Sequence, residues 1–435
     1  MSEVLRLGIA GLGTVGAGVV KILTARGAHL SAATGRSIAI SAVSARDRKK
    51  DRGIDLSGIR WEDDPLALAR ADDVDVVVEL IGGSEGVARD LVEAALGAGK
   101  HVVTANKALV AHHGGSLARL AEAKGVALNY EAAVAGGIPI VKTMREALAA
   151  NEVRSIHGIL NGTCNYILTE METTGRDFGD VLKDAQALGY AEADPSFDVG
   201  GVDAAHKLAI LTSLAFGTEV DFGAVQIEGI EKISATDISF AREFGYKIRL
   251  LAIAEKLESG IVQRVHPALV PEGTPLAAVS GVYNAVAVDA DRVGHMVLEG
   301  RGAGEGPTAS AVLSDIVDIA RGLILPPFIV PADCLKKLVQ PPVDTHKKSF
   351  YIRVRAVDRA GSMAAITQAL AQASVSIERI VQRGDRKDGS GRLPVVFVTH
   401  ETDEGTMARA RAHLAEHEDV AGTPLVLRIE DGELR

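Results

Sequence analysis

A glycine-rich segment near the N-terminus constrains the fold more than any other feature of the chain. Residues 11–16 read Gly-Leu-Gly-Thr-Val-Gly, and they follow a short apolar run at residues 7–10 and open a helical stretch. In this context the first glycine permits a tight turn, the second lets the backbone approach a pyrophosphate, and the third lets the helix pack on the strand. A structural glycine turn is the alternative, but the flanking strand and helix favour dinucleotide binding. The residues assigned to this site are Gly11, Gly13, Thr14, Val15 and Gly16.

Short β-branched runs alternate with helical stretches through the first 130 residues. The strand-like runs cover residues 7–10, 38–43, 74–80, 101–104 and 126–130. Amphipathic stretches, such as residues 86–98, lie between them. Parallel strands need crossover connections, which helices usually supply. The sequence therefore predicts an α/β fold whose N-terminal domain, residues 1–130, is a Rossmann doubly wound parallel sheet.

The pattern changes after Pro139. Longer helical stretches, such as residues 178–188, precede strand-like segments at residues 248–254 and 281–288. We expect an α+β domain over residues 131–325 that binds the substrate, carries catalysis and forms a dimer.

Prolines interrupt the chain before a third pattern begins. They stand at positions 326, 327, 331, 341 and 342 and predict an irregular linker over residues 326–347. Residues 348–435 then follow the order strand, helix, strand, strand, helix, strand. This βαββαβ order predicts a C-terminal ferredoxin-like domain.

The composition argues against several classes of partner. With 47 basic and 57 acidic residues the net charge is −10, which offers no electrostatic footprint for nucleic acid or an anionic membrane. No apolar stretch resembles a membrane span or the core of a signal peptide. The two cysteines, Cys164 and Cys334, belong to no zinc-binding or disulfide pattern. We expect a cytoplasmic protein that acts on small molecules.

The tip of the second predicted strand indicates which dinucleotide is preferred. NAD-selective sites usually place an acidic residue there, which binds the ribose diol. Here the strand ends in Ser44-Ala45-Arg46, and Arg46 is followed by basic residues at 48–50 that can neutralise a 2′-phosphate. The sequence favours NADP. NAD is the alternative coenzyme, with Asp47 as its ribose ligand. For the basic run itself, the alternative is a solvated loop without a binding role.

Several further segments closely resemble homoserine dehydrogenases. They are residues 104–107, 131–139, 158–166, 189–207 and 302–304, so the resemblance covers essentially the whole chain. The segment 189–207, which begins Gly-Tyr-Ala-Glu-Ala-Asp-Pro, is the most specific of them. The resemblance implies reversible hydride transfer between NADPH and L-aspartate 4-semialdehyde, which gives L-homoserine on the route to threonine and methionine.

Asp203 and Lys207 are four residues apart in a helical stretch and therefore project from one face. That spacing alone also fits an ordinary surface ion pair. The resemblance implies that Lys207 is the acid/base. A free lysine has a pKa of about 10.4, which burial or a second cation such as Lys107 is expected to lower. Glu192 and Asp203 would hold the substrate's ammonium and hydroxyl groups, and Asp198 would support them.

Lys107 has two open roles. It is either a catalytic group that stabilises charge near the bound nicotinamide or an anchor for the substrate carboxylate. The resemblance also places three glycines against the cofactor, which are Gly189, Gly302 and Gly304.

The segment 131–138 resembles the monovalent cation loop of the family. By that resemblance a sodium ion is held by a carboxylate and backbone carbonyls of Glu131, Val134, Gly136 and Ile138. The residues alone predict only a glycine-rich turn. Such an ion would stiffen the joint between the cofactor and substrate domains.

From residue 348 onward the chain resembles an ACT regulatory domain. ACT domains pair side by side and bind amino acids at the loop after the first strand, which predicts feedback inhibition by threonine. That loop reads Ala-Gly-Ser-Met at residues 360–363, where the family usually has Pro-Gly-Val-Leu. A purely oligomeric role is the alternative. We expect a homodimer or homotetramer.

Two other functions compete with this interpretation. One is another NADP oxidoreductase of an amino-acid-derived carbonyl, which would need a different substrate pocket. The other is a catalytically silent sensor of amino acids and redox state. The joint presence of Glu192, Asp203 and Lys207 argues against the silent sensor.

Two reactive side chains near these motifs are expected to be structural. His206 is adjacent to Lys207, but neighbouring positions on a helix point about 100° apart. Cys164 resembles the nucleophile of a thiol-dependent dehydrogenase, yet the sequence offers no paired histidine.

Overall fold

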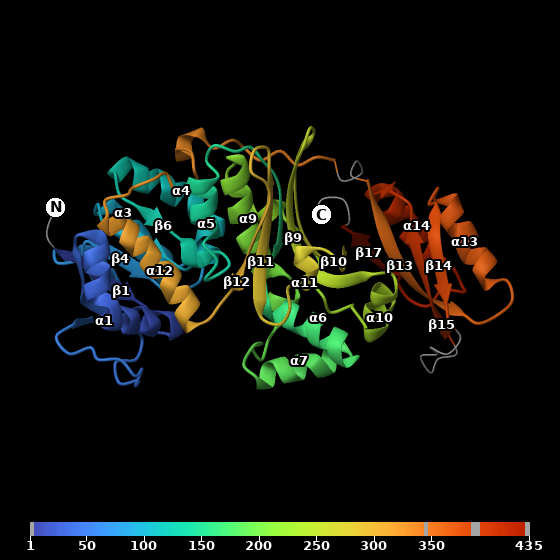
Figure 1. Cartoon of the computed structure of the whole chain (residues 1–435), viewed down its shortest axis with the longest axis horizontal. Coiled ribbons are helices and arrows are strands. Elements are labelled where there is room, and N and C mark those ends of the chain that lie inside the picture. Colours follow the sequence, from blue (N-terminus) through green and yellow to red (C-terminus); the bar gives the residue numbers. More distant parts are fainter. Residues whose placement is uncertain (1–3, 343–346, 384–391, 431–435) are drawn as a thin grey trace.

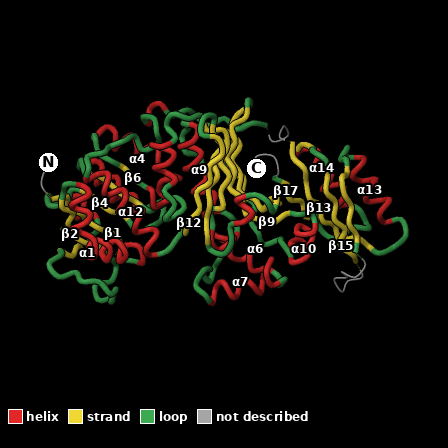
Figure 2. The backbone as a smooth tube through the Cα atoms, in the orientation of Figure 1, coloured by secondary structure: helices red, strands yellow, loops and turns green. Residues whose placement is uncertain are grey.

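The computed structural model describes residues 4–342, 347–383 and 392–430. The molecule is elongated, and its N-terminal, central and C-terminal parts follow one another along the long axis (Figure 1). The strands gather in each part with helices beside them (Figure 2). Within the described ranges, no helix combines the length and the apolar composition that crossing a membrane requires.

The N-terminal part is a parallel sheet of six strands in the order β3-β2-β1-β4-β5-β6. The strands are β1 (Val4–Ala10), β2 (Ser37–Ser44), β3 (Arg60–Glu62), β4 (Val76–Glu79), β5 (His101–Thr104) and β6 (Leu128–Asn129). The connecting helices are α1 (Thr14–Thr34), α2 (Leu66–Arg70), α3 (Val87–Gly97) and α4 (Lys107–Lys124). The predicted Rossmann sheet is confirmed. Its strand order reverses between β1 and β4, and doubly wound sheets bind ligands at that point, beyond the carboxyl ends of the strands.

A helix from far along the chain completes this part. The glycine-rich passage at residues 300–307 predicts a turn that opens a helix, and α12 (Glu305–Ala320) begins there. α12 lies beside the elements of the first part (Figure 1), and its apolar face shares one core cluster with β1, β4 and α1. The range 131–325, predicted as the middle domain, therefore contains a helix that packs on the first domain.

The central part is a mixed sheet covered by helices. Its main strands are β7 (Val153–Ile159), β9 (Tyr246–Leu257), β10 (Gly260–Pro271), β11 (Tyr283–Ala290) and β12 (Gly294–Arg301), in the order β12-β11-β7-β9-β10, and β8 (Gln226–Ile227) pairs with β10. The helices are α6 (Gly162–Thr174), α7 (Phe178–Ala187), α8 (Ser196–Val199), α9 (Val202–Phe216), α10 (Ala235–Glu243), α11 (Pro275–Ala278) and the 3-10 turn η3 (Phe222–Ala224). Every residue of α9 from 203 to 214 is buried, so its polar side chains lie inside the protein.

Three short helical turns join the first two parts. They are the 3-10 turn η1 (Glu131–Ala133), α5 (Ile140–Lys142) and the π-helical turn η2 (Thr143–Ala147). Tyr130, just before η1, is fully buried and packs against the tilted ring of Phe328 with ring centroids 5.5 Å apart. The joint is therefore packed rather than open.

The C-terminal part has the predicted βαββαβ order. It consists of β13 (Lys347–Val357), α13 (Ser362–Gln372), β14 (Ile377–Gln382), β15 (Arg392–Thr399), β16 (Thr402–Asp403), α14 (Glu404–Glu416) and β17 (Leu425–Ile429). The sheet order is β17-β13-β15-β14, and β17 also pairs in parallel with β10. Arg353 of β13 donates to Asp237 of α10 at 2.6 Å. The C-terminal sheet is thus continuous with the central sheet and packs on α10.

The described part of the linker, residues 326–342, lies against the protein. Tyr130 Oη donates to the Pro327 carbonyl at 2.6 Å, and Ile261 N donates to the Val339 carbonyl at 2.8 Å. The 3-10 turn η4 (Ala332–Cys334) contacts α4. These contacts fix the path between the first and third parts.

Candidate active site

The glycine-rich loop has the geometry of a phosphate cradle. Gly11 has a φ of +102°, and a Cβ there would lie 2.4 Å from the Leu80 carbonyl oxygen. A Cβ on Gly16 would lie 2.0 Å from the Gly11 carbonyl oxygen, so both positions require glycine. Gly13 instead faces open space and is exposed. The loop therefore presents bare backbone at the position where a pyrophosphate would approach.

The helix that follows this loop, α1, is joined by the start of α12, which lies beside Gly18. α1 starts after Gly13 and α12 after Gly304, and neither start is capped by a side chain. The helices run parallel, because Glu305 at the start of α12 pairs at 2.8 Å with Lys21, about two turns into α1, and Arg321 donates to the Ala33 carbonyl near the end of α1. Helix N-termini carry unpaired N–H groups and partial positive charge, which favour a phosphate. The cofactor-binding role of Gly304 stays a prediction.

The turn that opens α12 packs against the loop predicted to hold a cation. A Cβ on Gly136 would lie 2.3 Å from the Gly302 carbonyl oxygen. Gly136 also has a φ of +54°, which side chains rarely adopt. The absence of a side chain at Gly136 lets the backbone of the joint approach this turn closely, whereas a side chain on Gly302 would collide with Asn284.

The loop after β2 carries the predicted basic residues. Arg46 is exposed and makes no hydrogen bond or ion pair with another described residue. Arg52, which the sequence pattern did not reveal, donates to the Leu12 carbonyl at 3.0 Å and to the Asp47 carbonyl at 2.5 Å. Its guanidinium lies 5.7 Å from the centre of the Trp61 ring. Arg52 therefore ties the basic loop to the glycine-rich loop.

Three charged side chains from two helices meet beyond the carboxyl edge of the parallel sheet. Lys107 is the first residue of α4, and Asp203 and Lys207 lie one turn apart on α9. Lys207 Nζ is 2.7 Å from Asp203 Oδ2, and Lys107 Nζ is 3.0 Å from Asp203 Oδ1. Asp203 and Lys207 are buried, whereas the Lys107 side chain is 33% exposed. The structure brings together three of the residues that the sequence proposed.

Two further groups complete this cluster. Lys207 Nζ donates to the Leu160 carbonyl at 2.7 Å. Asn161 Nδ2 donates to Asp198 Oδ1 at 2.8 Å and to Asp203 Oδ2 at 2.9 Å. Neither Leu160 nor Asn161 was proposed from the sequence, although both lie in the 158–166 segment that carries part of the resemblance.

The two carboxyl groups of the cluster differ in their affinity for a proton. Burial by itself would raise the pKa of Asp203, but the charges of Lys207 and Lys107 outweigh it and hold that pKa well below its usual range. Burial raises the pKa of Asp198, and the hydrogen bond from Asn161 opposes the shift. The cluster therefore contains one firmly ionised carboxylate between two lysines.

Glu192 lies on the exposed loop between α7 and α8. Its carboxylate has no hydrogen bond or ion pair with another described residue. Gly189 opens this loop with a φ of +75° and faces open space. Thr163 Oγ1 donates to the Tyr190 carbonyl at 2.7 Å, which anchors the loop to the start of α6. The substrate-binding role of Glu192 stays a prediction.

His206 and Cys164 do not join the lysine cluster. The His206 ring packs 4.3 Å from Phe222 and 5.3 Å from His112, and burial lowers its pKa to about 4. Cys164 is buried in α6 and donates to the Asp198 carbonyl at 3.2 Å. Burial raises the pKa of its thiol well above the usual value, so a reactive thiolate is disfavoured.

Glu131 is buried in the joint between the first two parts. Its carboxylate accepts hydrogen bonds from Val141 N at 2.9 Å and Lys142 N at 2.7 Å, and burial raises its pKa to about 7. The Ile138 carbonyl already accepts a hydrogen bond from Ile140 N. No cluster of three or more His, Cys, Asp or Glu side chains able to hold a metal occurs in the described residues. The sodium site at Glu131, Val134, Gly136 and Ile138 stays a prediction.

A buried carboxylate that the sequence did not reveal fixes the start of α4. Glu79, at the end of β4, accepts hydrogen bonds from Thr104 Oγ1 at 2.6 Å and from Ile81 N at 2.7 Å. Thr104 Oγ1 accepts from Asn106 N at 2.9 Å, and the Asn106 side chain caps α4. This network places Lys107, the next residue, at the edge of the sheet.

Comparison with known proteins identifies the family. The family model described as homoserine dehydrogenase matches residues 139–317, its NAD binding domain matches residues 11–131, and the ACT domain matches residues 350–418. A homoserine dehydrogenase from Neisseria gonorrhoeae is 45% identical over 439 residues, which cover 98% of this chain and 98% of that protein. This chain belongs to the homoserine dehydrogenase family.

Solved homoserine dehydrogenase structures share its fold. The crystal structure of a homoserine dehydrogenase from Thiobacillus denitrificans matches with a TM-score of 0.91 and 42% identity, covering 98% of each chain. A hyperthermophilic archaeal homoserine dehydrogenase in complex with NADPH matches with a TM-score of 0.62 and 27% identity, covering 72% of this chain and 97% of that one. The expected family, the nicotinamide-cofactor domain and the ACT domain are confirmed.

Proposed function

We propose that this chain catalyses the reversible NADPH-dependent reduction of L-aspartate 4-semialdehyde to L-homoserine, a step toward threonine and methionine. The observation that carries the proposal is the cluster of Lys107, Asp203 and Lys207. It lies at the same edge of the parallel sheet as the glycine cradle, in a chain of the homoserine dehydrogenase family. A silent sensor would have no need for a buried, charged cluster of this kind, because isolated buried charges are costly.

Lys207 is suited to exchange a proton with the substrate oxygen. An ammonium group has three N–H donors, and Asp203 and Leu160 engage two of those on Lys207. The third is available to the oxygen at which negative charge develops during reduction. The bound nicotinamide supplies the hydride, and Asp203 keeps the ammonium group oriented. In the reverse direction the neutral amine accepts the proton of the homoserine hydroxyl.

The other polar residues are suited to different groups of the substrate. Lys107 is more exposed than Lys207, which supports its binding the substrate carboxylate or balancing charge near the nicotinamide. Glu192, whose carboxylate has no partner among the described residues, is suited to the substrate ammonium. Asp198 supports the cluster through Asn161 rather than by direct contact with a lysine.

NADP is the proposed coenzyme. The open backbone at Gly13 and the uncapped starts of α1 and α12 support pyrophosphate binding at this edge, and Gly189, Gly302 and Gly304 are the further proposed cofactor contacts. The exposed guanidinium of Arg46 supports recognition of a 2′-phosphate, for which arginine is well matched. NAD is the alternative, with Asp47 as its ribose ligand.

Three further features belong to the proposal. A sodium ion near Glu131 would favour the ionised form of this buried carboxylate, whose pKa burial raises. Threonine would bind at the ACT loop of residues 360–363 and inhibit the enzyme. We also expect at least a homodimer, formed through the central part.

One assay tests the central proposal. The purified chain is incubated with L-homoserine and either NADP or NAD in the presence of sodium, and the near-ultraviolet absorbance of the reduced coenzyme is followed. We expect coenzyme reduction that is faster with NADP and is inhibited by threonine. A folded preparation that reduces neither coenzyme would favour the sensor or another carbonyl substrate.

A further inference from the structure

Asn161 links the acidic side chains of the site to the helix behind them. Its Nδ2 donates to Asp198 at 2.8 Å and to Asp203 at 2.9 Å. Its Oδ1 accepts a hydrogen bond from Cys164 N at 2.8 Å and thereby caps α6. The side chain is only 4% exposed.

We propose that Asn161 is a positioning residue for the proton exchange: it holds the Asp203 carboxylate so that its two oxygens face two different lysines. The proposal rests on the function proposed above, in which Lys207 is the acid/base. Asn161 acts through Asp203 and does not touch the reacting atoms.

The hydrogen bonds of Asp203 show how this positioning works. Oδ1 faces Lys107, whereas Oδ2 accepts from both Lys207 and Asn161. The terminal torsion of a carboxylate is soft, so two flexible lysine side chains alone leave its rotation poorly defined. A rigid third donor removes that freedom. With Asp203 and Leu160 both fixed, the remaining N–H of Lys207 has one direction.

Both donor groups of the Asn161 amide are already used within the protein. The amide nitrogen has two N–H groups, and each has a carboxylate partner. The amide oxygen accepts from a backbone N–H, so the chemistry of its partners also settles which end of the amide is which. A substrate group that accepts a hydrogen bond would have to displace one of the two carboxylates. Asn161 is therefore suited to positioning rather than to substrate binding.

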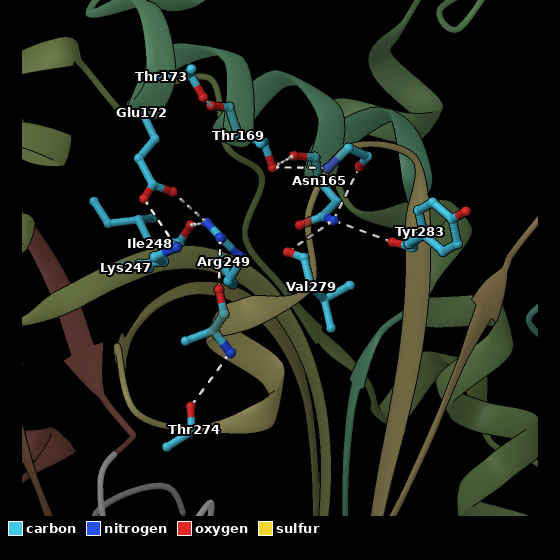
Figure 3. A network of polar contacts seen from close by, with 12 residues as sticks. Asn165, Thr169, Glu172, Thr173, Lys247, Ile248, Arg249, Thr274, Val279 and Tyr283 are labelled. Carbon is cyan, nitrogen blue, oxygen red and sulfur yellow. Dashed lines mark hydrogen bonds and ion pairs between the residues drawn. The ribbon is translucent and has the colours of Figure 1, made fainter.

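Helix α6, which Asn161 caps, is itself held in place by polar contacts (Figure 3). One turn later, Asn165 donates to the carbonyls of Gly281 and Tyr283 at 3.1 and 3.2 Å. Near the other end of the helix, Glu172 pairs with the buried Arg249 of β9 at 3.2 Å. The helix is thus tied to the central sheet near both ends. Because Asn161 caps this helix, its amide is held at a fixed position where it donates to Asp203.

Asn161 also separates two acidic groups. Its amide lies between Asp198 and Asp203, and the charge of Asp203 contributes to raising the pKa of Asp198. A carboxylate in place of the amide would put a third acidic group beside the lysines. That extra negative charge would favour the protonated form of Lys207.

Two substitutions separate capping from positioning. Asn161→Ser keeps a good N-cap residue for α6 but cannot reach both carboxylates. Asn161→Asp keeps the cap and the shape but loses the donor and adds charge. Thr274→Ala is the matched control, because Thr274 is a buried helix N-cap of the same part that lies outside the site.

We expect Asn161→Ser to bind NADPH like the wild type and to lower kcat about 10- to 100-fold, as small misplacements of catalytic groups do. In Asn161→Asp, the acid limb of homoserine oxidation should move to higher pH by about one unit, because the lysine loses its proton less readily. Thr274→Ala should lower Tm and leave kcat and the pH profile unchanged.

The possible failures are distinct. If the wild-type chain oxidises homoserine and Asn161→Ser changes only Tm, the positioning proposal is overturned while the proposed function stands. If Asn161→Ser does not fold, an Asn161→Asp variant with the wild-type kcat and pH profile overturns the positioning proposal in the same way. If the wild type itself reduces no coenzyme, the proposed function fails first.

Discussion

Asp203 and Lys207 form a buried ion pair of 2.7 Å across one turn of α9, and Lys107 reaches the same carboxylate from α4. Because Lys107 still pairs with Asp203 when Lys207 is removed, Lys207→Ala is expected to fold. Its kcat should fall about 10²- to 10⁴-fold, the range that general acid–base catalysis contributes. Steady-state rates with homoserine and NADP measure this, and fluorescence titration of NADPH should show unchanged binding.

A matched variant checks that the loss is specific to Lys207. Lys256 also forms a lysine–carboxylate pair, with Glu152 at 2.5 Å, but both partners are at least half exposed. Lys256→Ala should therefore keep the wild-type kcat. Full turnover by a folded Lys207→Ala enzyme would contradict the acid/base role.

Removal of Lys107 distinguishes its two roles. If it anchors the substrate carboxylate in the ground and transition states alike, Lys107→Ala should raise KM for homoserine about 10- to 100-fold and leave kcat within about threefold. We expect this result, because the side chain is one-third exposed and contacts Asp203 from outside α9. A fall in kcat at unchanged KM would instead place Lys107 in the chemistry.

Arg46 is expected to set the coenzyme preference. Its guanidinium makes no hydrogen bond or ion pair with another described residue, so Arg46→Ala should change the free energy of unfolding very little. We expect KM for NADP to rise about tenfold, which is about 1.4 kcal/mol of binding, and KM for NAD to stay the same. Arg26→Ala removes another exposed positive charge, on α1, and serves as the control. Equal effects on both coenzymes would remove Arg46 from 2′-phosphate recognition.

The periodic parts of the fold were predictable from the sequence. The runs at residues 38–43 and 101–104 became β2 and β5, because strands of a parallel sheet are rich in apolar and β-branched residues. β3 was missed, since three residues show no period. The packing of α12 on α1 is a contact between residues almost 300 positions apart, which no local pattern reveals.

The site was only partly predictable. The spacing of Asp203 and Lys207 and the glycine pattern of residues 11–16 are local, so the sequence alone indicates the helix and the loop that carry them. The sequence did not reveal the roles of Asn161, Glu79 and Arg52, because each makes a hydrogen bond to a residue that is distant in sequence. Single buried polar residues also produce no periodic pattern that would mark them. Their hydrogen-bond partners can be identified only from the three-dimensional positions of the sheet edges and helix starts.

His206 is expected to make stability fall in mild acid. In the folded chain burial lowers its pKa to about 4, whereas an unfolded histidine has a pKa of about 6.5. As pH falls from about 6.5 to about 4, the unfolded state binds this proton first, so stability falls by at most about 1.4 kcal/mol per pH unit. Above pH 6.5 both states are neutral and the effect vanishes.

Replacing His206 by phenylalanine tests this origin. The ring already packs against Phe222, so His206→Phe should fold and should lose less stability between pH 7 and pH 5 than the wild type. Urea unfolding at several pH values measures the difference. His29→Phe, at an exposed position on α1, should keep the wild-type slope. An unchanged slope in His206→Phe would assign the acid sensitivity to other groups.

The ACT domain reaches the site through a short loop. Arg428 of β17 contacts Glu228 at 3.2 Å. The backbone after Glu228 continues to Ile230, whose N–H donates to the Val199 carbonyl at 2.9 Å. Val199 directly follows Asp198, which Asn161 joins to Asp203. A change in the ACT sheet therefore has a contiguous route to the lysine cluster.

Glu228→Gln should weaken this route without disturbing the fold, because the Glu228 side chain is 53% exposed and the change preserves its shape. We expect a kcat close to the wild type without threonine and inhibition that needs several-fold more threonine. Because coupling between two sites is reciprocal, homoserine should also affect threonine binding less in this variant. Glu378→Gln, which changes a carboxylate that pairs only with its neighbour Arg379 among the described contacts, is the matched control. Wild-type inhibition of Glu228→Gln would show that the ACT domain signals by another path.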